Sequence, residues 1–392
     1  MSNDKRPEIR FPGFADDWEE LKFSEVLKVN SGRDYKHLEE GDIPVYGTGG
    51  YMLSVNDKLS DIDGIGIGRK GTINKPQYLK APYWTVDTLF YITAKKGYNL
   101  NYLYSMVQRI NWKRMDESTG VPSLSKNVIE KVHKEFPSYD EQAKIGFFFK
   151  QLDDTIALHQ RKLDLLKETK KGFLQKMFPK DGASVPEIRF PGFTEDWEER
   201  KLGETKTYFT DGNYGESYPS SKDMSDKENG VPFLRGSDFS NGYLDSSNAN
   251  YIKYEKHQEL TSGHIKQDDI VIAVRGSLGT LGYANKENEG WNINSQLAIL
   301  RTNKSEILGM FLIQYLLSNK GQKEILSRNT GTALKQLPIK QLKDIPIPMP
   351  AISEQQKIGT FFKQLDDTIA LQQRKLDLLK ETKKGFLQKM FV

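Results

Sequence analysis

Two segments of this chain each occur twice, and this repetition constrains the fold more than any other feature. PEIRFPGFADDWEE at 7–20 returns as PEIRFPGFTEDWEE at 186–199. A 38-residue segment at 141–178 returns at 354–391 with 35 identical positions. Chance does not produce such identity, so the chain is an internal duplication. Its plan is a divergent unit, a constant segment, a second divergent unit and the same constant segment again.

Between the repeated segments the two copies differ, yet short stretches still correspond. Most of the extra length of the second copy lies between Pro232 and Trp291. The corresponding stretches are GDIPVYG at 41–47 with GVPFLRG at 230–236, GIGRKGTIN at 66–74 with AVRGSLGTL at 273–281, WTVDTLFYI at 84–92 with WNINSQLAI at 291–299, and STG at 118–120 with NTG at 329–331. The two divergent units are therefore expected to share one plan.

The constant segments carry apolar residues in alternating steps of four and three, which is the heptad pattern of a helix that packs along another helix. This pattern predicts one long helix in each copy. The predicted seam consists of Ile145, Phe149, Leu152, Ile156, His159, Leu163, Leu166, Phe173 and Met177 in the first copy, and of Ile358, Phe362, Leu365, Ile369, Gln372, Leu376, Leu379, Phe386 and Met390 in the second. Such a stripe is too narrow to anchor a globular core, but it suits one partner helix.

The nearest partner for each predicted helix is the other copy, because the globular unit between them permits an antiparallel return. In that arrangement His159 and Gln372 form a polar layer near the middle that sets the register. Lys170 and Lys383 lie off-centre with their stems along the seam. Intermolecular homodimerisation through each helix is the alternative.

Short β-rich runs bounded by Gly, Asn and Asp, with one helical patch in each unit, predict a mixed α/β fold. The expected architecture is two α+β globular units separated by two long helices, which form an intramolecular antiparallel coiled coil with pseudo-two-fold symmetry. The predicted boundaries are 1–139 for the first globular unit, 140–179 for the first helix, 180–351 for the second globular unit and 352–392 for the second helix.

The composition excludes several classes of protein and site. The chain has no cysteine, which excludes disulfides, a thiolate nucleophile and any zinc site with a cysteine ligand. No stretch approaches the roughly 18 apolar residues that cross a bilayer and no signal peptide is evident, so a cytoplasmic protein is expected. The net charge is +4, of which the helical segments 141–178 and 354–391 contribute +6, so the remainder sums to −2. A nucleic-acid surface on the globular units would therefore be a local patch.

Most catalytic motifs are absent. Residues 66–71 match the G-x-G-x-x-G pattern, but a β-like stretch ending in Pro76 follows where a dinucleotide site needs a helix. The chain has no Gly-Lys dipeptide and hence no Walker A loop, and no Pro-Pro dipeptide and hence no amino-methyltransferase loop. His257 and His264 lie seven residues apart with no thiol nearby, which does not favour a metal site. Catalysis by this chain alone is not expected.

Loops with basic, polar and glycine residues recur at matched positions in both copies. Arg and Lys contact phosphates or guanine edges, Asn pairs with adenine, and Gly permits a close approach of the backbone. A solvated turn is the ordinary alternative for any one loop, and the recurrence at matched positions gives DNA contact equal weight. The candidate residues are Arg33, Tyr35, Lys36, Arg69, Lys70 and Thr72 in the first copy, and Asn213, Tyr214, Arg235, Ser237, Arg275 and Ser277 in the second.

This architecture resembles the specificity subunit of type I restriction–modification systems over essentially the whole chain. The resemblance is carried by the EQ-x-KIG-x-FF-x-x-LD-x-x-I openings of the helices at 141–156 and 354–369, and by GRKGTIN…PYWTVDTLFYI at 68–92, VYGTGG at 45–50, LRGSDF at 234–239 and IPIPMPAISEQ at 345–355. In that family each target-recognition domain reads one half of a split, asymmetric DNA sequence, and the paired helices set the length of the spacer.

The resemblance also implies partners and cofactors. The implied partners are double-stranded DNA, two modification subunits that dock on the helices, and two restriction subunits. S-adenosylmethionine, ATP and Mg²⁺ are implied on those partner subunits and none on this chain, which is then non-catalytic. A coiled-coil scaffold whose globular units bind proteins is one alternative. A self-sufficient methyltransferase is another, which the missing Pro-Pro dipeptide disfavours.

Overall fold

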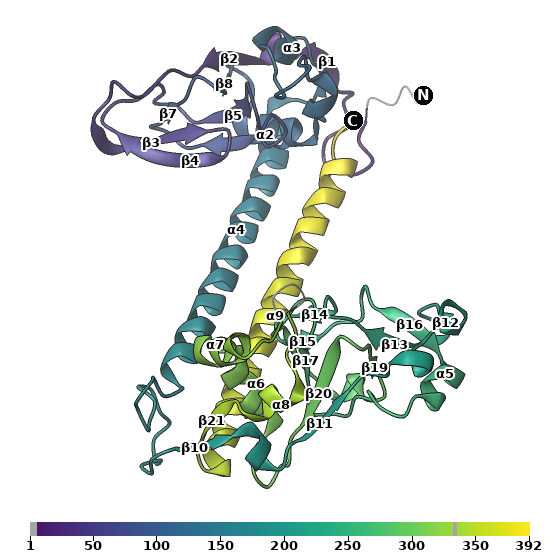
Figure 1. Cartoon of the computed structure of the whole chain (residues 1–392). Helices are drawn as coiled ribbons and strands as arrows, with labels where there is room; N and C mark the ends of the chain where they lie inside the picture. The colour runs from purple at the N-terminus through teal and green to yellow at the C-terminus, as the bar shows by residue number, and fades with distance from the viewer. Residues whose placement is uncertain (1–5, 332–334) are drawn as a thin grey trace. The chain divides into compact units, whose positions relative to one another are not determined.

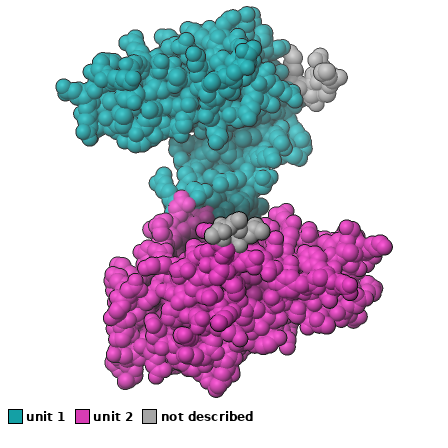
Figure 2. All heavy atoms as spheres, in the orientation of Figure 1, with its two compact units in different colours: residues 1–162, 372–392 teal, residues 163–371 magenta. Residues whose placement is uncertain are grey.

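The computed structural model describes residues 6–331 and 335–392, and the chain divides into two compact units (Figure 2). Unit 1 consists of residues 1–162 and 372–392, and unit 2 of residues 163–371. Each unit combines one α/β part with one half of each of two long helices, α4 (Tyr139–Lys176) and α9 (Ile352–Lys389). Among the described residues, no helix is both long and apolar enough to cross a membrane.

The α/β part of unit 1 contains a four-stranded and a three-stranded sheet (Figure 1). The four-stranded antiparallel sheet has the order β2 (Leu27–Ser31), β8 (Leu89–Ala94), β5 (Gly64–Gly68) and β6 (Gln77–Leu79). In the three-stranded sheet, β3 (Glu40–Gly47) lies between the antiparallel β4 (Gly50–Val55) and the parallel β7 (Trp84–Thr85). The helices are α1 (Phe23–Val26), α2 (Leu100–Arg109), α3 (Lys126–Glu130) and the 3₁₀ helix η1 (Trp112–Met115).

Unit 2 enlarges the same plan. Its six-stranded sheet has the order β11 (Tyr208–Asp211), β20 (Leu297–Arg301), β17 (Ile270–Ala273), β18 (Leu281–Tyr283), β15 (Tyr243–Leu244) and β14 (Phe239–Ser240). Its four-stranded sheet has the order β12 (Met224–Ser225), β16 (Asn250–Lys253), β13 (Gly230–Leu234) and β19 (Asn292–Ile293). The parallel pair β13–β19 corresponds to β3–β7 of unit 1, as the matched stretches GDIPVYG and GVPFLRG predicted.

Short helices complete unit 2. They are α5 (Tyr254–Glu259), α6 (Gly309–Leu317), α7 (Asn319–Ser327) and α8 (Ile339–Lys343), with the 3₁₀ helices η2 (Leu202–Thr205), η3 (Gly215–Ser217), η4 (Ser221–Asp223) and η5 (Lys286–Asn288). Helix α6 is buried along most of its length, and it contributes to the largely apolar core beneath the six-stranded sheet. Helix α2 takes the corresponding place in the core of unit 1.

Each α/β part opens and closes on one pair of antiparallel strands. In unit 1, β1 (Glu19–Lys22) pairs with β9 (His133–Phe136). In unit 2, β10 (Glu198–Lys201) pairs with β21 (Pro346–Met349). The closing strand comes just before the long helix in both cases. The two ends of each α/β part therefore lie side by side, and its interior can vary without moving them.

The ends of the long helices belong to the cores of both units. In unit 1, Phe149 of α4 packs at 5.8 Å between ring centroids against Phe391, in a cluster with aromatic residues of α2. In unit 2, Phe362 of α9 packs at 6.5 Å against Phe178, in a cluster with aromatic residues of α6. The expectation that the helical stripe does not anchor a globular core is therefore wrong at the helix ends, because paired aromatic residues widen the stripe there.

Within each unit the halves of α4 and α9 lie side by side and run in opposite directions (Figure 1). In unit 1, Phe148 near the start of α4 meets Phe386 near the end of α9, with ring centroids 5.1 Å apart. In unit 2, Phe173 near the end of α4 meets Phe361 near the start of α9 at 5.0 Å. Every predicted seam residue is buried or half-buried. The intramolecular antiparallel coiled coil is confirmed, and the two helices of one chain cover each other's seam.

Polar contacts fix the register of the helices. In unit 1, the side-chain nitrogen of Gln372 lies 2.5 Å from Nδ1 of His159 and 3.3 Å from its carbonyl oxygen, as the predicted polar layer requires. The two lysines expected along the seam each pair with an aspartate of the facing helix: Lys170 with Asp366 at 2.6 Å in unit 2, and Lys383 with Asp153 at 2.5 Å in unit 1. The same contact thus occurs once in each unit, with the helices exchanged.

The repeated segments 7–20 and 186–199, named here the clamp segments, join the ends of the two helices. In unit 1, Arg10 binds Glu141 in the first turn of α4 through two hydrogen bonds of 2.7 and 2.8 Å. The backbone N–H of Ile9 donates to the Lys389 carbonyl at the end of α9, at 2.9 Å. One segment therefore binds the beginning of one helix and satisfies a free carbonyl at the end of the other.

Unit 2 repeats the clamp with the helices exchanged. Arg189 binds Glu354 of α9 at 2.7 and 2.8 Å, and Ile188 N–H donates to the Lys176 carbonyl of α4 at 2.9 Å. The side chains of Glu141 and Glu354 are 0% and 1% exposed, so each buried carboxylate depends on its arginine. The two clamp segments are nearly identical because each fits the same pair of helix ends.

A glutamine follows each buried glutamate and connects the helix to its α/β part. Gln142 accepts a hydrogen bond from the N–H of Asn99 at 3.1 Å, and Gln355 accepts one from the N–H of Leu308 at 2.9 Å. Both donors lie at the start of a helix that packs on the sheet, α2 in unit 1 and α6 in unit 2. The Glu-Gln openings of the long helices are therefore structural.

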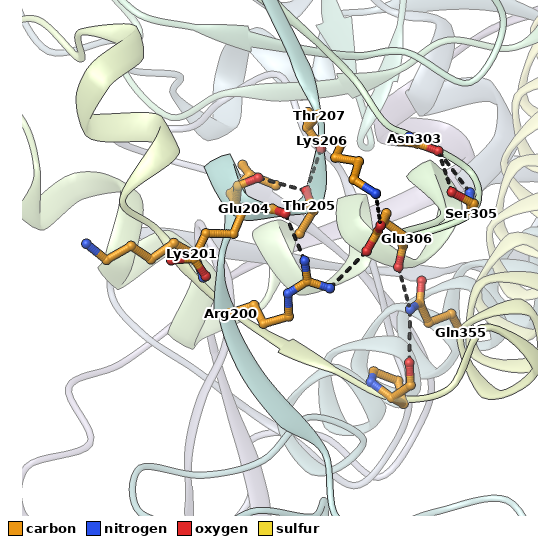
Figure 3. A network of polar contacts seen from close by, with 12 residues as sticks. Arg200, Lys201, Glu204, Thr205, Lys206, Thr207, Asn303, Ser305, Glu306 and Gln355 are labelled. Carbon is orange, nitrogen blue, oxygen red and sulfur yellow. Dashed lines mark hydrogen bonds and ion pairs between the residues drawn. The ribbon is translucent and has the colours of Figure 1, made fainter.

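A polar network around Glu306 lies beside this junction in unit 2 (Figure 3). Lys206 and Arg200 pair with the Glu306 carboxylate at 2.7 and 2.9 Å. These two cations hold the pKa of Glu306 below its usual range. The Glu306 carbonyl oxygen accepts a hydrogen bond of 3.4 Å from Gln355. The network joins the opening strand of the α/β part to the start of α9.

Candidate nucleic-acid interface

The connection between β7 and β8 organises the loops of unit 1. We name residues 85–88 the crossing segment of this unit. The N–H of Arg33 donates to the Thr85 carbonyl at 2.9 Å, and the N–H of Arg69 donates to the Thr88 carbonyl at 2.8 Å. A Cβ added to Gly32 would lie 2.0 Å from the Val86 carbonyl oxygen, so only glycine permits this approach. The crossing segment thus gathers two loops that carry predicted contact residues.

Residues 293–296 form the crossing segment of unit 2. A Cβ added to Gly212 would lie 2.3 Å from the Asn294 carbonyl oxygen, which repeats the close approach seen at Gly32. The N–H of Arg275 donates to the Gln296 carbonyl at 3.2 Å. The stretches WTVDTLFYI and WNINSQLAI therefore both contain the segment that holds the loops, but their predicted pairing is one residue out of register, because Val86 is matched by Asn294 and not by Ile293.

The structure corrects the register of a second predicted correspondence. Lys70 forms an isolated β-bridge with Ser123, and Arg275 forms the same bridge with Gln336. The glycine after each cation has a positive φ, 88° in unit 1 and 71° in unit 2. The counterpart of Arg275 is therefore Lys70, and the pairing of GIGRKGTIN with AVRGSLGTL is two residues out of register.

Three segments of unit 1 that are far apart in the sequence meet at Gly71. Its N–H donates to the Pro122 carbonyl at 2.8 Å, in the loop 118–123. A Cβ added to Gly71 would lie 3.8 Å from the hydroxyl of Thr48, at the tip of the hairpin β3–β4. Gly71 itself belongs to the basic turn 69–72. This turn, the hairpin tip and the loop 118–123 therefore form one surface.

Unit 2 brings its predicted loops together in a similar way. A Cβ added to Gly236 would lie 3.8 Å from the hydroxyl of Ser277, so the loop 235–237 adjoins the turn 275–277. The guanidinium carbon of Arg275 lies 5.2 Å from the ring centroid of Tyr214, within the range of a cation–π contact. Burial raises the pKa of the Tyr214 hydroxyl, which donates to the Ser295 carbonyl at 3.1 Å.

The predicted cations of unit 1 are free for a ligand. Arg33, Lys36, Arg69 and Lys70 are exposed, and none makes an ion pair with any described residue. Arg69 lies 5.8 Å from the ring centroid of Phe90, which restricts its guanidinium without neutralising it. Tyr35 and Thr72 are half-buried beside them. Unpaired cations at a fixed site are what phosphate contact requires.

Several predicted contact residues of unit 2 are instead used within the protein. Arg235 binds the buried carboxylate of Asp238 through two side-chain hydrogen bonds of 3.1 Å, and the hydroxyl of Ser237 donates to the same carboxylate at 3.0 Å. Asn213 is buried, and its amide donates to the Ser262 carbonyl at 2.8 Å. The side chain of this predicted contact residue is therefore engaged within the protein. Arg235 and Ser237 anchor a loop, whereas Arg275, Ser277 and part of Tyr214 stay accessible.

Two parts of the unit 1 surface are not among the contact residues predicted from the sequence. Thr48 lies at a plain hairpin tip, and the loop 118–123 contains no charged residue. The stretches STG and NTG correspond in the sequence, but their composition does not place them beside a basic turn. That placement follows from the bridges of Lys70 and Arg275 to the strand-like residues after each stretch.

His257 and His264 come together in unit 2, with ring centroids 4.9 Å apart. Both face the buried side chain of Asn292, whose oxygen lies 2.5 Å from Nδ1 of His257 and whose nitrogen lies 3.4 Å from Nδ1 of His264. Within residues 6–331 and 335–392, no group of three or more His, Asp or Glu residues is arranged to hold a metal ion. The pair therefore joins α5 to β19.

A family model described as the type I restriction modification DNA specificity domain matches residues 15–168 and 194–381. The chain belongs to this family. The two matched ranges together contain both crossing segments and both sets of loops. The duplication found in the sequence is therefore a duplication of the DNA specificity domain.

Curated relatives of this family include two archaeal proteins and a bacterial one. The chain is 29% identical over 269 residues to the putative type I restriction enzyme MjaX specificity subunit of Methanocaldococcus jannaschii, covering 68% of this chain and 60% of that protein. It is 23% identical to the MjaVIII specificity subunit of the same organism, covering 70% and 65%. It is 24% identical to the EcoBI specificity subunit of Escherichia coli, covering 88% and 72%. The matches thus span less than two thirds of the two archaeal proteins.

Solved structures of the DNA specificity domain family share this fold. The S subunit of a type I restriction-modification system from M. genitalium superposes with a TM-score of 0.71 at 16% identity, over 99% of both chains. A chain from a structure of type I R-M complex assembly and conformational transition superposes with a TM-score of 0.51 at 18% identity, over 98% of this chain and 99% of that one. The same arrangement of two α/β parts and two long helices is thus kept at low sequence identity.

Proposed function

We propose that this chain is the DNA sequence-specificity subunit of a type I restriction–modification complex, in which the α/β part of each unit reads one half of a split, asymmetric target. The observation that carries the proposal is that the loops held by equivalent crossing segments carry different side chains in the two units. Unit 1 offers free arginines and lysines, and unit 2 offers Arg275 held over Tyr214. Two α/β parts with the same backbone arrangement but different contact residues suit a DNA target whose two halves differ in sequence.

The charge of the chain indicates that its partners supply part of the phosphate neutralisation. Outside the helical segments 141–178 and 354–391 the chain sums to −2. A surface with so little excess positive charge neutralises few phosphates, so DNA binding by the isolated chain is weak and sensitive to salt. Tight binding then requires the modification subunits, which supply further phosphate contacts.

Exposed leucines on the long helices are the proposed docking positions for those subunits. In unit 1, Leu158 of α4 and Leu378 of α9 are 64% and 69% exposed. In unit 2, the matched Leu371 of α9 and Leu165 of α4 are 53% and 68% exposed. Large apolar side chains exposed on a helix indicate a protein contact. The same pair of leucines in each unit, with the helices exchanged, suits two identical modification subunits.

The remaining chemistry is assigned to the partners. S-adenosylmethionine for the methylation of adenine is bound by the two modification subunits, and ATP and Mg²⁺ by two restriction subunits that translocate and cleave DNA in the cytoplasm. This chain is non-catalytic in the proposal. It selects the sequence, and its helices set the distance between the two half-sites.

Exchange of one α/β part tests the proposal. Residues 198–349 are replaced by the corresponding segment of another family member, with the ends placed on the paired strands β10 and β21. The variant is expressed with its modification subunits, and methylated sites are mapped across the host genome. One half of the target changes, while the other half and the spacer remain.

The matched control exchanges residues 19–136, whose ends lie on β1 and β9. This exchange changes the opposite half of the target. Methylation that changes in both halves after a single exchange, or in neither, contradicts the assignment of one half-site to each α/β part.

A further inference from the structure

The loop 118–123 of unit 1 is held rigidly by one carboxylate. Asp116 accepts hydrogen bonds from the N–H of Ser118 at 3.0 Å, from its hydroxyl at 2.8 Å and from the N–H of Ser123 at 2.8 Å. These bonds, that of Ser123 first, hold the pKa of Asp116 below its usual range. Glu117 N–H also donates to the Ser123 carbonyl at 3.1 Å, which closes the loop. The loop therefore has a defined shape at neutral pH.

The rigid loop carries an apolar side chain into solvent. Val121 is 67% exposed, and Thr119, Gly120 and Pro122 around it are exposed as well. A single exposed valine is ordinary on a protein surface. This one stands on a loop whose backbone is fixed on both sides, so the position of its side chain is also defined.

The loop is joined to the basic turn of the same unit. Leu124 N–H donates to the Arg69 carbonyl at 2.9 Å, Lys70 bridges Ser123, and Gly71 N–H donates to the Pro122 carbonyl at 2.8 Å. Arg69 and Lys70 have no ion-pair partner among the described residues. A methyl-bearing side chain is thus fixed beside two free cations.

This combination matches one feature of double-stranded DNA. Free cations contact phosphates and bring the neighbouring residues to a groove. In the major groove the base edges carry hydrogen-bonding groups, and the thymine C5-methyl is the apolar group that distinguishes one base pair from another. A rigid, branched apolar side chain beside phosphate-binding cations is suited to pack on that methyl.

We propose that Val121 reads a thymine methyl in the half-site of unit 1, with the loop 118–123 entering the major groove. The inference rests on the proposed function, and it adds a specificity-determining residue that the charged loops do not contain. Contact with one methyl group changes affinity by about four-fold, since burial of a CH₂-sized group contributes ~0.8 kcal/mol.

The test uses the complex of the full chain with its modification subunits. The half-site of unit 1 is the one that stays unchanged when residues 198–349 are exchanged. Each thymine in it, on either strand, is replaced in turn by deoxyuridine, which removes only the C5-methyl. The dissociation constants of the wild-type complex and of a Val121→Ala complex are then measured on every DNA.

The wild-type complex binds one deoxyuridine DNA about four-fold more weakly than the thymine DNA. The Val121→Ala complex loses a similar factor on thymine DNA and does not distinguish the two DNAs. The control variant Val185→Ala, at another exposed valine, keeps the wild-type discrimination. Because Val121 is exposed, its substitution leaves the melting temperature unchanged, which is measured in parallel.

Two results overturn the inference while leaving the proposed function intact. In one, the wild-type complex binds every deoxyuridine DNA as tightly as thymine DNA. In the other, Val121→Ala retains the full discrimination. A complex that shows no preference for any DNA sequence is a different result, because it contradicts the proposed function itself.

Discussion

The two units use equivalent crossing segments but treat their cations differently. In unit 1, Lys70 and its neighbours stand free of ion pairs among the described residues. In unit 2, Arg235 is bound to Asp238, and the Lys70 counterpart, Arg275, lies over Tyr214. The frame depends on backbone hydrogen bonds and on the glycines at the close approaches, which both units share, whereas the charged surface depends on side chains that differ. A duplicated backbone arrangement can therefore carry two different sets of DNA-contact residues.

A difference in chain path explains why unit 2 uses Arg235 internally. In unit 1 the chain turns directly from β3 into β4 at residues 48–49. In unit 2 residues 235–249 separate β13 from β16, and this detour forms the hairpin β14–β15 at the edge of the six-stranded sheet. The pair of Arg235 with Asp238 anchors the start of the detour. The longer connection of unit 2 is held in place by an internal ion pair, and Arg235 supplies its positive charge.

The largest effect is expected where the two units are alike. Arg10→Ala and Arg189→Ala each leave a buried glutamate unpaired at a helix start, which costs about 3 to 5 kcal/mol. The two losses should be equal, because the clamp geometry is the same in both units. Urea unfolding followed by tryptophan fluorescence measures them, since Trp18 and Trp197 are each buried within a clamp segment.

Arg6→Ala is the control for this pair of variants. Arg6 pairs with Asp17 at 2.7 Å, but both side chains are more than half exposed, so the loss stays within about 1 kcal/mol. A clamp variant that unfolds no more easily than Arg6→Ala would show that the repeated segments do not hold the helix ends.

A smaller effect on the free energy of unfolding is expected where the two units differ, at their predicted contact cations. Arg235→Ala removes the side-chain hydrogen bonds to Asp238, whose side chain is 1% exposed, and should lower the free energy of unfolding by about 2 kcal/mol. Lys70→Ala in unit 1 should change it by no more than about 0.5 kcal/mol. If Arg235→Ala instead leaves stability unchanged and weakens DNA binding by the complex, Arg235 contacts DNA. The contrast between a paired cation in unit 2 and free cations in unit 1 would then not hold.

The smallest effect concerns phosphate contact. In the complex with modification subunits, Lys70→Ala should make the slope of log K against log salt shallower by about 0.9 without changing the methylated sequence. Arg235→Ala should leave this slope as it is, because its charge is already paired. Titrations of DNA binding across salt concentrations measure both slopes. Equal slopes for wild type and Lys70→Ala would show that this free cation does not meet a phosphate.

The helices were predictable in detail because their pattern is local. The heptad pattern identifies the seam residues, and the duplication indicates that each helix is the partner of the other. His159 and Gln372 could therefore be placed opposite one another. The role of the clamp segments was not predictable. Arg10 and Glu141 are far apart in the sequence, and nothing in either segment marks the pair.

The loops show the same limit at the candidate site. Residues such as Lys70 and Arg275 could be named because basic turns recur at matched positions. Their correct alignment required the β-bridges to Ser123 and Gln336, which are contacts across the fold. Whether a cation is free or paired also depends on its neighbours: the sequence marks Arg235 as a contact residue, but in the structure it is bound to the buried Asp238.

The duplication, the long paired helices and the family follow from the order of the residues, because repetition and heptad spacing can be read along the chain. Which charges stand free, which glycines let the backbone cross, and the place of Val121 beside Arg69 and Lys70 follow only from the folded chain. Ion pairing and burial depend on distances through space. In a sheet-based domain those distances join residues that the chain keeps far apart.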